Sequence, residues 1–343
     1  MKAGIKEEPG PGITYSDVST PTLKTGEVLL KIGACGICGS DLHIYHWHAS
    51  WRYLEKYLPK VLGHEFSGTI VELANDVRGF SVGDRVAVEP GVTCGECFYC
   101  RTGQPNICIS REILGIERNG GFAEFASVPA RNLYKIPDNL SFEVGAFLEI
   151  FALAVHAVER SAFKIGDKVA VLGVGPIGLS VIALTKSMGA SRVVATGVNA
   201  DALLRLPTAR KLGADKIVNV ESEISALPEE IKHDGKFDVV FEISGSNNTL
   251  IDAVNICRIG GEVVLVGVPG NPMSSFDHVT VVMSEILLRP IRARKHSSWL
   301  KAIKIAEKMD VSPIIQPIMK LKQIDDAFRI ATNKEGIKVI IKP

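Results

Sequence analysis

Short stretches in which apolar and polar residues alternate fill the first third of the chain. Val28, Leu30 and Ile32 occupy every second position, the period expected of a strand with one buried face. Glycine, proline and aspartate separate such stretches, as they do in turns between strands. This part of the chain is therefore predicted to be β-rich, with further strands at residues 69–71, 85–88 and 122–128.

The pattern of apolar and polar residues changes at about residue 168. Apolar runs now alternate with segments long enough for helices, which is typical of a parallel, doubly wound sheet. The predicted elements are a helix at 177–188, strands at 168–172, 192–196, 237–241 and 262–266, and a last strand near 287–293. The fold class is thus α/β.

The C-terminal tail does not continue this alternation. It offers an amphipathic helix at 298–309 and a strand at 338–341. We therefore expect the tail to return to the first domain. Residues 1–154 and 294–343 would form a β-rich domain, and residues 155–293 would form a nucleotide-binding domain inserted between them.

Composition narrows the class of protein. A chain of 343 residues is too long for one ordinary hydrophobic core, so two domains are expected. A net charge of +1 gives no overall attraction to nucleic acid or to an anionic membrane, and we predict neither as a partner. Residues 1–12 lack the apolar core of a signal peptide, and the longest apolar stretches fall short of the roughly 20 residues that span a bilayer. These features predict a cytoplasmic protein.

A glycine-rich loop, GVGPIG, follows the first strand of the second domain and opens a predicted helix, which is the context that a G-x-G-x-x-G motif needs. Gly173 permits a tight turn, Gly175 lets the backbone approach a pyrophosphate, and Gly178 lets the helix pack against the strand. Pro176, which has no N–H, and Ile177 lie at the helix N-terminus, where the free N–H groups of the first turn are presented to the phosphates. An ordinary strand–helix turn is the alternative.

The next strand ends in Gly197, and no Asp or Glu stands where one usually binds the adenosine ribose of NAD. Loss of that charge removes repulsion against a 2′-phosphate and tilts the choice towards NADP, with Arg205 or Arg210 as the counter-charge. Asp201 remains a candidate for the ribose, so NAD and NADP both stay open. The predicted cofactor contacts in this part of the domain are Gly197, Asn199, Arg205 and Val266.

Four of the seven cysteines form one cluster: Cys94, Cys97, Cys100 and Cys108. In a reducing compartment such clustering favours metal over disulfides. Four thiolates suit a tetrahedral zinc ion with no open position, which makes the role structural. The competing iron–sulfur pattern has a shorter last gap followed by proline, and this chain has neither. We expect this lobe, about residues 90–110, to use zinc in place of a core of its own.

A second group of possible metal ligands is spread along the first domain. It comprises Cys38, His64, Glu65 and Glu149. One thiolate, one imidazole and carboxylates could hold a zinc ion with an exchangeable position, as catalysis requires. Each residue also has an ordinary structural explanation, and the spacing in the sequence alone does not assign the four residues to one metal site.

Four motifs follow one another along the chain: GICGSDLH at 36–43, GHE at 63–65, the four-cysteine lobe and the glycine-rich loop. In this order they resemble the zinc-dependent, medium-chain alcohol dehydrogenase superfamily, most of all its sorbitol (polyol) and threonine 3-dehydrogenase branches. The likeness covers essentially the whole chain. It implies a GroES-like β-rich catalytic domain, a Rossmann cofactor domain, one catalytic and one structural zinc ion, and NAD or NADP.

The resemblance implies that Cys38 and His64 hold the catalytic zinc, and that Glu65 and Glu149 share the remaining protein position or hold a zinc-bound water. A glutamate at 149, where other members of the superfamily carry cysteine, points to the polyol and threonine branch. That glutamate is usually followed by proline. Here Ile150 follows, which leaves the local backbone and the exact role of Glu149 open.

The resemblance also implies a mechanism. Zinc lowers the pKa of the alcohol, and hydride passes to the nicotinamide ring. Ser40 takes the released proton and passes it through the nicotinamide ribose towards His43. A turn serine and a satisfied core histidine are the plain alternatives.

An aromatic, histidine-rich loop, YHWHASW at 45–51, is the main candidate for substrate recognition. Trp47 and Trp51 stand where threonine dehydrogenases also carry tryptophan, and they either line a pocket or pack the loop. We predict hydride transfer between NAD(P) and the secondary alcohol of a small polar substrate. A polyol is the first candidate, with L-threonine or a general secondary alcohol as alternatives.

Other classes of protein fit less well. A zinc-free quinone reductase or a non-catalytic relative would not need Cys38 and His64, and a zinc-ribbon nucleic-acid binder would carry a basic, aromatic stretch around its cysteines. Relatives of this kind form dimers or tetramers, often by continuing the Rossmann sheet across subunits. We accordingly predict a homodimer or homotetramer, with the apolar segment 262–268 suited to the sheet edge.

Overall fold

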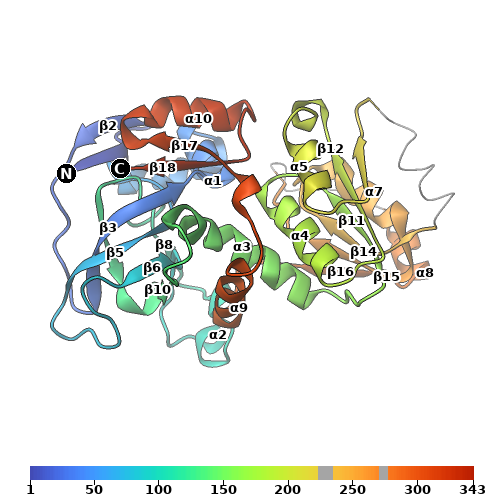
Figure 1. Cartoon of the computed structure of the whole chain (residues 1–343), viewed down its shortest axis with the longest axis horizontal. Helices are drawn as coiled ribbons and strands as arrows, with labels where there is room; N and C mark the ends of the chain where they lie inside the picture. Colours follow the sequence, from blue (N-terminus) through green and yellow to red (C-terminus); the bar gives the residue numbers. More distant parts are fainter. Residues whose placement is uncertain (223–234, 270–276) are drawn as a thin grey trace. The chain divides into compact units, whose positions relative to one another are not determined.

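The computed structural model describes residues 1–222, 235–269 and 277–343, and it divides into two compact units. Unit 1 comprises Met1–Ala152 and Lys295–Pro343, and unit 2 comprises Leu153–Arg294. The sequence had suggested divisions at 154/155 and 293/294. Figure 1 shows the N-terminal part of the chain in blue and the C-terminal part in red, both within unit 1.

The main sheet of unit 1 has the strand order β10-β6-β5-β3-β18-β17, and β9 also pairs with β3. Its strands are β3 (Glu27–Gly36), β5 (Glu65–Leu73), β6 (Arg85–Val88), β9 (Phe125–Pro129), β10 (Leu133–Lys135), β17 (Ile315–Lys320) and β18 (Lys338–Lys342). The smaller sheets contain β1 (Lys2–Lys6), β2 (Thr14–Asp17) and β4 (Lys60–Val61), and β7 (Gly91–Val92) with β8 (Glu112–Ile113).

The helices of unit 1 are α1 (Gly39–Tyr45), α2 (Phe98–Arg101), α3 (Phe142–Arg160, which continues into unit 2), α9 (His296–Ala306) and α10 (Ile324–Thr332). In the described part of the chain, no helix is both long and apolar enough to cross a membrane. The predicted tail helix at 298–309 corresponds to α9, which begins and ends slightly earlier.

The alternation predicted around residue 30 is present only in part of β3, because Leu29, between Val28 and Leu30, is buried as well. Leu30 and Ile32 are buried, whereas Lys31 between them is exposed. The strand predicted at 122–128 begins later, at Phe125. Phe122 instead donates its backbone N–H to the carbonyl of Leu62 at 3.0 Å, outside the β9 ladder.

The tail of the chain is part of the core of unit 1. Strand β18 pairs antiparallel with the central strand β3. Phe328 of α10 meets Phe122 edge-on, with ring centroids 5.7 Å apart, and Trp299 of α9 stacks on Tyr134 with centroids 4.7 Å apart. Buried aromatic contacts therefore fasten the tail to the β-rich core.

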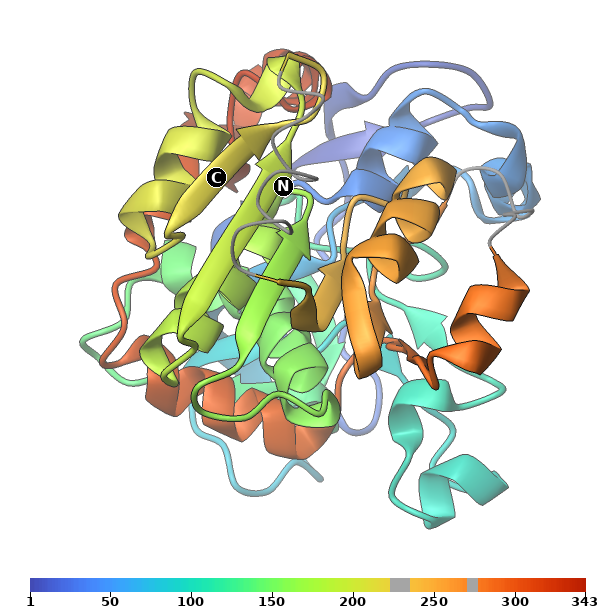
Figure 2. The same cartoon turned by 90° about the vertical axis from the view of Figure 1, so that its right-hand side faces the viewer.

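Unit 2 contains a parallel sheet (Figure 2), whose strand order is β13-β12-β11-β14-β15-β16. Its strands are β11 (Lys168–Leu172), β12 (Arg192–Gly197), β13 (Lys216–Asn219), β14 (Phe237–Glu242), β15 (Cys257–Leu265) and β16 (Leu287–Pro290). Its helices include α4 (Pro176–Ser187), α5 (Arg205–Lys211), α7 (Asn247–Ile256) and α8 (His278–Met283). The chain starts in the middle, builds one half and then the other, which is the Rossmann strand order. The α/β prediction is confirmed; of the strands that the structure describes in unit 2, only the short β13 was not predicted.

One prediction about this sheet is wrong. Residues 262–268 were expected to suit a sheet edge, but β15 pairs with β14 on one side and with β16 on the other. Among the described strands, β13 and β16 form the edges. The apolar run reflects burial inside a parallel sheet, where Val263 and Val264 are fully buried.

Candidate metal centres and nucleotide-binding loop

The four clustered cysteines come together in a small lobe of unit 1. The Sγ atoms of Cys94 and Cys108 are 3.5 Å apart, those of Cys97 and Cys108 3.9 Å, and those of Cys94 and Cys100 4.0 Å. A disulfide would need about 2.05 Å. Four sulfurs bound tetrahedrally at about 2.3 Å from one zinc ion lie about 3.8 Å apart. The lobe therefore fits a closed zinc site.

The cysteine lobe has almost no core of its own. Neither α2 nor the 3₁₀ turn Pro105–Ile107 buries a residue, and Phe98 and Ile109 are 71% and 75% exposed. The backbone N–H of Cys100 lowers the pKa of Cys97 to about 6, which favours the thiolate that zinc binds. A bound ion would thus take the place of a hydrophobic core.

The pairing of β3 with β5 brings three of the four dispersed candidate ligands, Cys38, His64 and Glu65, close together. Gly36 at the end of β3 faces Glu65 at the start of β5, and Cys38 immediately precedes helix α1. The donor atoms of Cys38, His64 and Glu65 consequently lie within 4.8 Å of one another. His64 and Glu65 are buried, and Cys38 is half-buried.

Asp41, which the sequence did not single out, completes the surroundings of His64. It is fully buried, with Oδ1 3.5 Å from His64 Nδ1, and Oδ2 accepts the backbone N–H of Cys38 at 2.9 Å. The second imidazole nitrogen, Nε2, lies 3.3 Å from Ser40 Oγ. A carboxylate behind a histidine commonly supports a metal ligand, because it fixes the ring orientation and the position of the proton.

The charge balance around His64 also fits a cation. Burial alone would lower the pKa of His64, but Asp41 and Cys38 outweigh it and raise the pKa well above its usual value. Within the described residues, Asp41 Oδ1 and His64 Nδ1 are buried without a full hydrogen bond. A zinc ion would supply the positive charge that the protein otherwise takes up as a proton on His64.

Glu65 has a buried partner, Lys338 of the C-terminal strand. The Lys338 ammonium group lies 2.8 and 2.7 Å from the two carboxylate oxygens and donates to the Ile37 carbonyl at 2.9 Å. Burial lowers the pKa of Lys338, but Glu65 raises it above its usual value, with help from Cys38 and Glu149. Glu149, buried in α3, is thus near this cluster, although it is not in the group within 4.8 Å. No local spacing relates Glu65 to Lys338, so the sequence could not reveal the pair.

Ser40 and His43, the predicted proton relay, lie on the same short helix, α1. His43 Nδ1 and His48 Nδ1 are 2.8 Å apart. Burial, together with His48 and His46, lowers the pKa of His43. His43 is therefore mostly neutral at pH 7 and able to accept a proton.

The tryptophans of the loop at 45–51 pack against the core of unit 1. Lys6 Nζ lies 5.3 Å from the centroid of the Trp47 ring, and Trp51 stacks on Tyr53 with centroids 6.3 Å apart. Of the two interpretations of these tryptophans, the structure supports loop packing.

Two of the three glycines of the nucleotide motif, Gly173 and Gly178, stand where a side chain would clash. Gly173 has a φ of +109°, and a Cβ there would lie 2.9 Å from the backbone nitrogen of Ser244. A Cβ on Gly178 would lie 1.9 Å from the Gly173 carbonyl oxygen. A Cβ on Gly175 would meet no atom within 4 Å, so the backbone is open there for a ligand to approach. Helix α4 begins at the next residue, Pro176, followed by Ile177.

The residues predicted near the adenosine are placed by β12 and the turn that follows it. Gly197 ends β12, and Asn199 begins the 3₁₀ turn Asn199–Asp201. Arg205 Nη1 lies 3.4 Å from Asp201 Oδ1, and both side chains are largely buried. Val266 donates its N–H to the Glu242 carbonyl at 2.9 Å, just beyond β15. Arg205 is therefore already engaged by an acidic neighbour.

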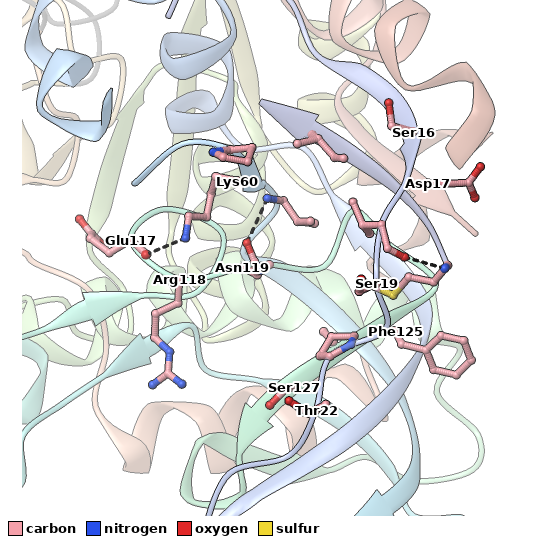
Figure 3. Close-up of a pocket in the computed structure, with 18 of the residues that line it drawn as sticks. Ser16, Asp17, Ser19, Thr22, Lys60, Glu117, Arg118, Asn119, Phe125 and Ser127 are labelled. Carbon is pink, nitrogen blue, oxygen red and sulfur yellow. Dashed lines mark hydrogen bonds between the residues drawn. The ribbon is translucent and has the colours of Figure 1, made fainter. Parts of the chain in front are cut away.

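A separate pocket of about 880 Å³ lies in unit 1 (Figure 3). None of the predicted site residues lines it. Two polar pairs lie in its lining: Arg118 pairs with Glu27 at 2.6 Å, and Lys60 donates to the Glu117 carbonyl at 3.1 Å.

Comparison with known proteins adds to this geometry. The family model described as alcohol dehydrogenase GroES-like domain matches residues 24–138, and the model described as zinc-binding dehydrogenase matches residues 176–308. The L-threonine 3-dehydrogenase of Shewanella sediminis is 35% identical, over 99% of this chain and 99% of its own length.

Solved structures agree with these matches. The 2R,3R-butanediol dehydrogenase of Bacillus subtilis is 31% identical, with a TM-score of 0.89 over 100% of this chain and 99% of that one. An alcohol dehydrogenase of E. coli CFT073, solved with NADH, is 29% identical with a TM-score of 0.90 and covers 100% and 99%.

Proposed function

Because the chain belongs to the zinc-dependent, medium-chain alcohol dehydrogenase family, we propose that it interconverts a secondary alcohol and a ketone on a small polar substrate, with NAD(P) as the hydride carrier. The observation that carries this proposal is the convergence of Cys38, His64 and Glu65, whose donor atoms lie within 4.8 Å. A donor set of this kind leaves a zinc position exchangeable for substrate.

The residues around this set would have separate tasks. Cys38 and His64 would hold zinc, with Glu65 and Glu149 sharing the remaining protein position. When bound, zinc supplies a Lewis acid that lowers the pKa of the substrate hydroxyl. Asp41 would keep the His64 proton on Nδ1, so that Nε2 stays available as a ligand.

The positive charge of Lys338 would neutralise the negative charge of Glu65. Both oxygens of Glu65 lie within 2.8 Å of the Lys338 ammonium group. A change in the coordination of Glu65 would therefore not leave a bare charge in the interior.

Ser40 and His43 would carry the proton that alcohol oxidation releases. A bound NAD(P) would supply the hydride acceptor, while Ser40 would take the hydroxyl proton and pass it, by way of the nicotinamide ribose, towards His43. His43 suits the role of acceptor, because burial and His48 lower its pKa and keep it neutral. Unit 2 would hold the cofactor pyrophosphate at the open backbone of Gly175.

L-Threonine and polyols are the first substrates to compare. A relative matching the whole chain is named L-threonine 3-dehydrogenase, and a similar solved structure is named a butanediol dehydrogenase. The test is absorbance of reduced nicotinamide with purified protein, using L-threonine, polyols and simple secondary alcohols, each with NAD⁺ and NADP⁺. Turnover of one class, lost on chelation and restored by zinc, is the expected result. No turnover by protein that binds both zinc and cofactor would overturn the proposal.

We further propose that the chain works in the cytoplasm as a homodimer or homotetramer. The free thiols of the lobe are suited to a reducing compartment. If subunits join through the Rossmann sheet, the available edges are β13 and β16 of the described strands. Light scattering of the purified protein would give the number of subunits.

A further inference from the structure

The end of β12 is where a Rossmann protein meets the adenosine ribose. An Asp or Glu at this position binds the ribose hydroxyls of NAD, whereas a nearby cation accommodates the 2′-phosphate of NADP. In this chain β12 ends in Gly197, which has no charge. Taken alone, the absence of a charge at Gly197 favours NADP. The charged side chains near the end of β12 also affect this preference.

The backbone N–H groups that follow Gly197 already bind carboxylates. Val198 N–H donates to Asp201 Oδ2 at 3.1 Å, and Asn199 N–H donates to Glu221 Oε2 at 2.7 Å. Exposed N–H groups in such a turn would otherwise be good ligands for a phosphate. A 2′-phosphate at this place would have to displace one carboxylate and lie beside the other.

Glu221 reaches this position from the neighbouring strand. It lies two residues beyond β13, which pairs with β12 so that Asn219 is opposite Gly197. Asn219 donates from Nδ2 to Asn199 Oδ1 at 2.8 Å, and its own Oδ1 accepts the Glu221 N–H at 3.2 Å. This network holds the Glu221 carboxylate at the end of β12.

The Glu221 carboxylate can accept a further hydrogen bond. Its side chain is exposed, and within the described residues Oε1 accepts no hydrogen bond. Of the two predicted counter-charges, Arg205 and Arg210, the first forms an ion pair with buried Asp201. A ribose hydroxyl would find an acceptor here, and a phosphate dianion would find a like charge.

We propose that Glu221 replaces the missing carboxylate of β12 and makes this chain select NAD over NADP. It accepts a hydrogen bond from the adenosine ribose and repels a 2′-phosphate. The inference rests on the proposed nicotinamide-dependent function, and it opposes the tilt towards NADP that Gly197 alone suggests.

The test is binding of NADH and NADPH to the full-length, zinc-loaded protein, measured by nicotinamide fluorescence without any substrate. We expect NADH to bind at least about tenfold more tightly than NADPH. Glu221→Gln keeps an acceptor for the Asn199 N–H but removes the charge. It should tighten NADPH binding about fivefold to tenfold and change NADH binding by less than about threefold, and added salt should shrink the difference between variant and wild type.

Asp252→Asn is the matched control, since it removes an exposed carboxylate from α7 of the same unit. It should leave the ratio of the two dissociation constants unchanged. Equal binding of both dinucleotides by the wild type, or NADPH binding that Glu221→Gln leaves unchanged, would overturn the inference while the dehydrogenase proposal stands. Failure of either dinucleotide to bind at all would overturn both.

Discussion

The two metal-ligand sets of unit 1 are built in opposite ways. The four cysteines are close neighbours in sequence and lie in a lobe whose short helical turns bury no residue. Cys38, His64 and Glu65 instead meet through the pairing of β3 with β5, beside Asp41 and Lys338, which are both buried. We therefore expect the lobe to need a bound ion in order to fold, whereas the dispersed set is held in place by the sheet.

We therefore expect a separation of stability from chemistry within one unit, in which the cysteine lobe serves stability and the dispersed set serves the reaction. A closed ring of four thiolates has no position for substrate, so its ion can only hold the lobe together. A set that the surrounding sheet already positions can leave one position exchangeable. Substitutions in the dispersed set should consequently change turnover, whereas substitutions in the cysteine lobe should change local unfolding.

The largest effect on turnover is expected from Cys38→Ser. Loss of the thiolate should lower kcat/KM about 10³-fold or more, because the Lewis acid is then lost or misplaced. Metal analysis should show one zinc ion fewer per chain, while the thermal unfolding midpoint changes little. A variant that keeps a tenth of wild-type activity would show that Cys38 is not a catalytic ligand.

Lys338→Met should have the next largest effect, on stability. In the zinc-free protein, where no ion can compensate the carboxylate, it leaves Glu65 charged and unpaired in the interior, which typically costs about 3–5 kcal/mol. The measurement is urea unfolding followed by tryptophan fluorescence. That signal reports unit 1, because it contains all three tryptophans, Trp47, Trp51 and Trp299.

Lys342→Met is the control for this measurement, since Lys342 lies on the same strand and pairs with Glu143 at 2.6 Å near the surface. That exposed pair should contribute no more than about 1 kcal/mol. Adding Glu65→Gln to Lys338→Met should recover part of the lost stability, because it removes the uncompensated charge. Equal effects of the two lysine substitutions would contradict the role given to the buried pair.

Asp41→Asn should have an intermediate effect on the catalytic site. The asparagine keeps the shape but weakens the support of His64, and loss of a carboxylate that supports a metal-binding histidine typically costs about 10–100-fold in metal affinity or activity. Competition with a graded zinc chelator, followed by loss of turnover, measures the affinity. Asp17→Asn, at an exposed carboxylate paired with Lys2, should change nothing. Wild-type zinc affinity in Asp41→Asn would remove Asp41 from the site.

The same contrast explains what the sequence could predict. The cysteine lobe is a local pattern, and the glycine motif lies between a strand and a helix, so both could be identified from spacing and context. Asp41 lay inside a quoted motif but gave no signal of its own, because its task depends on the orientation of His64. Lys338 pairs with Glu65 across 273 positions, and only the fold brings the two together. Glu221 was missed for a similar reason, since it acts at the end of a strand that is not its own.

The smallest effect on turnover is expected from Cys100→Ser. Without one thiolate the lobe should lose its ion and, having no core, open locally. Because the Cys38 and His64 site is held by the sheet, kcat at 25 °C should stay within about threefold of wild type. Limited proteolysis should nevertheless cut between residues 94 and 108 at least about tenfold faster, and metal analysis should again show one zinc ion fewer. Serine is the sharpest choice here, because it changes one ligand atom and almost no volume. If Cys100→Ser instead abolished turnover with the catalytic zinc still bound, the lobe would have to act on the reaction, and the separation of stability from chemistry would fail.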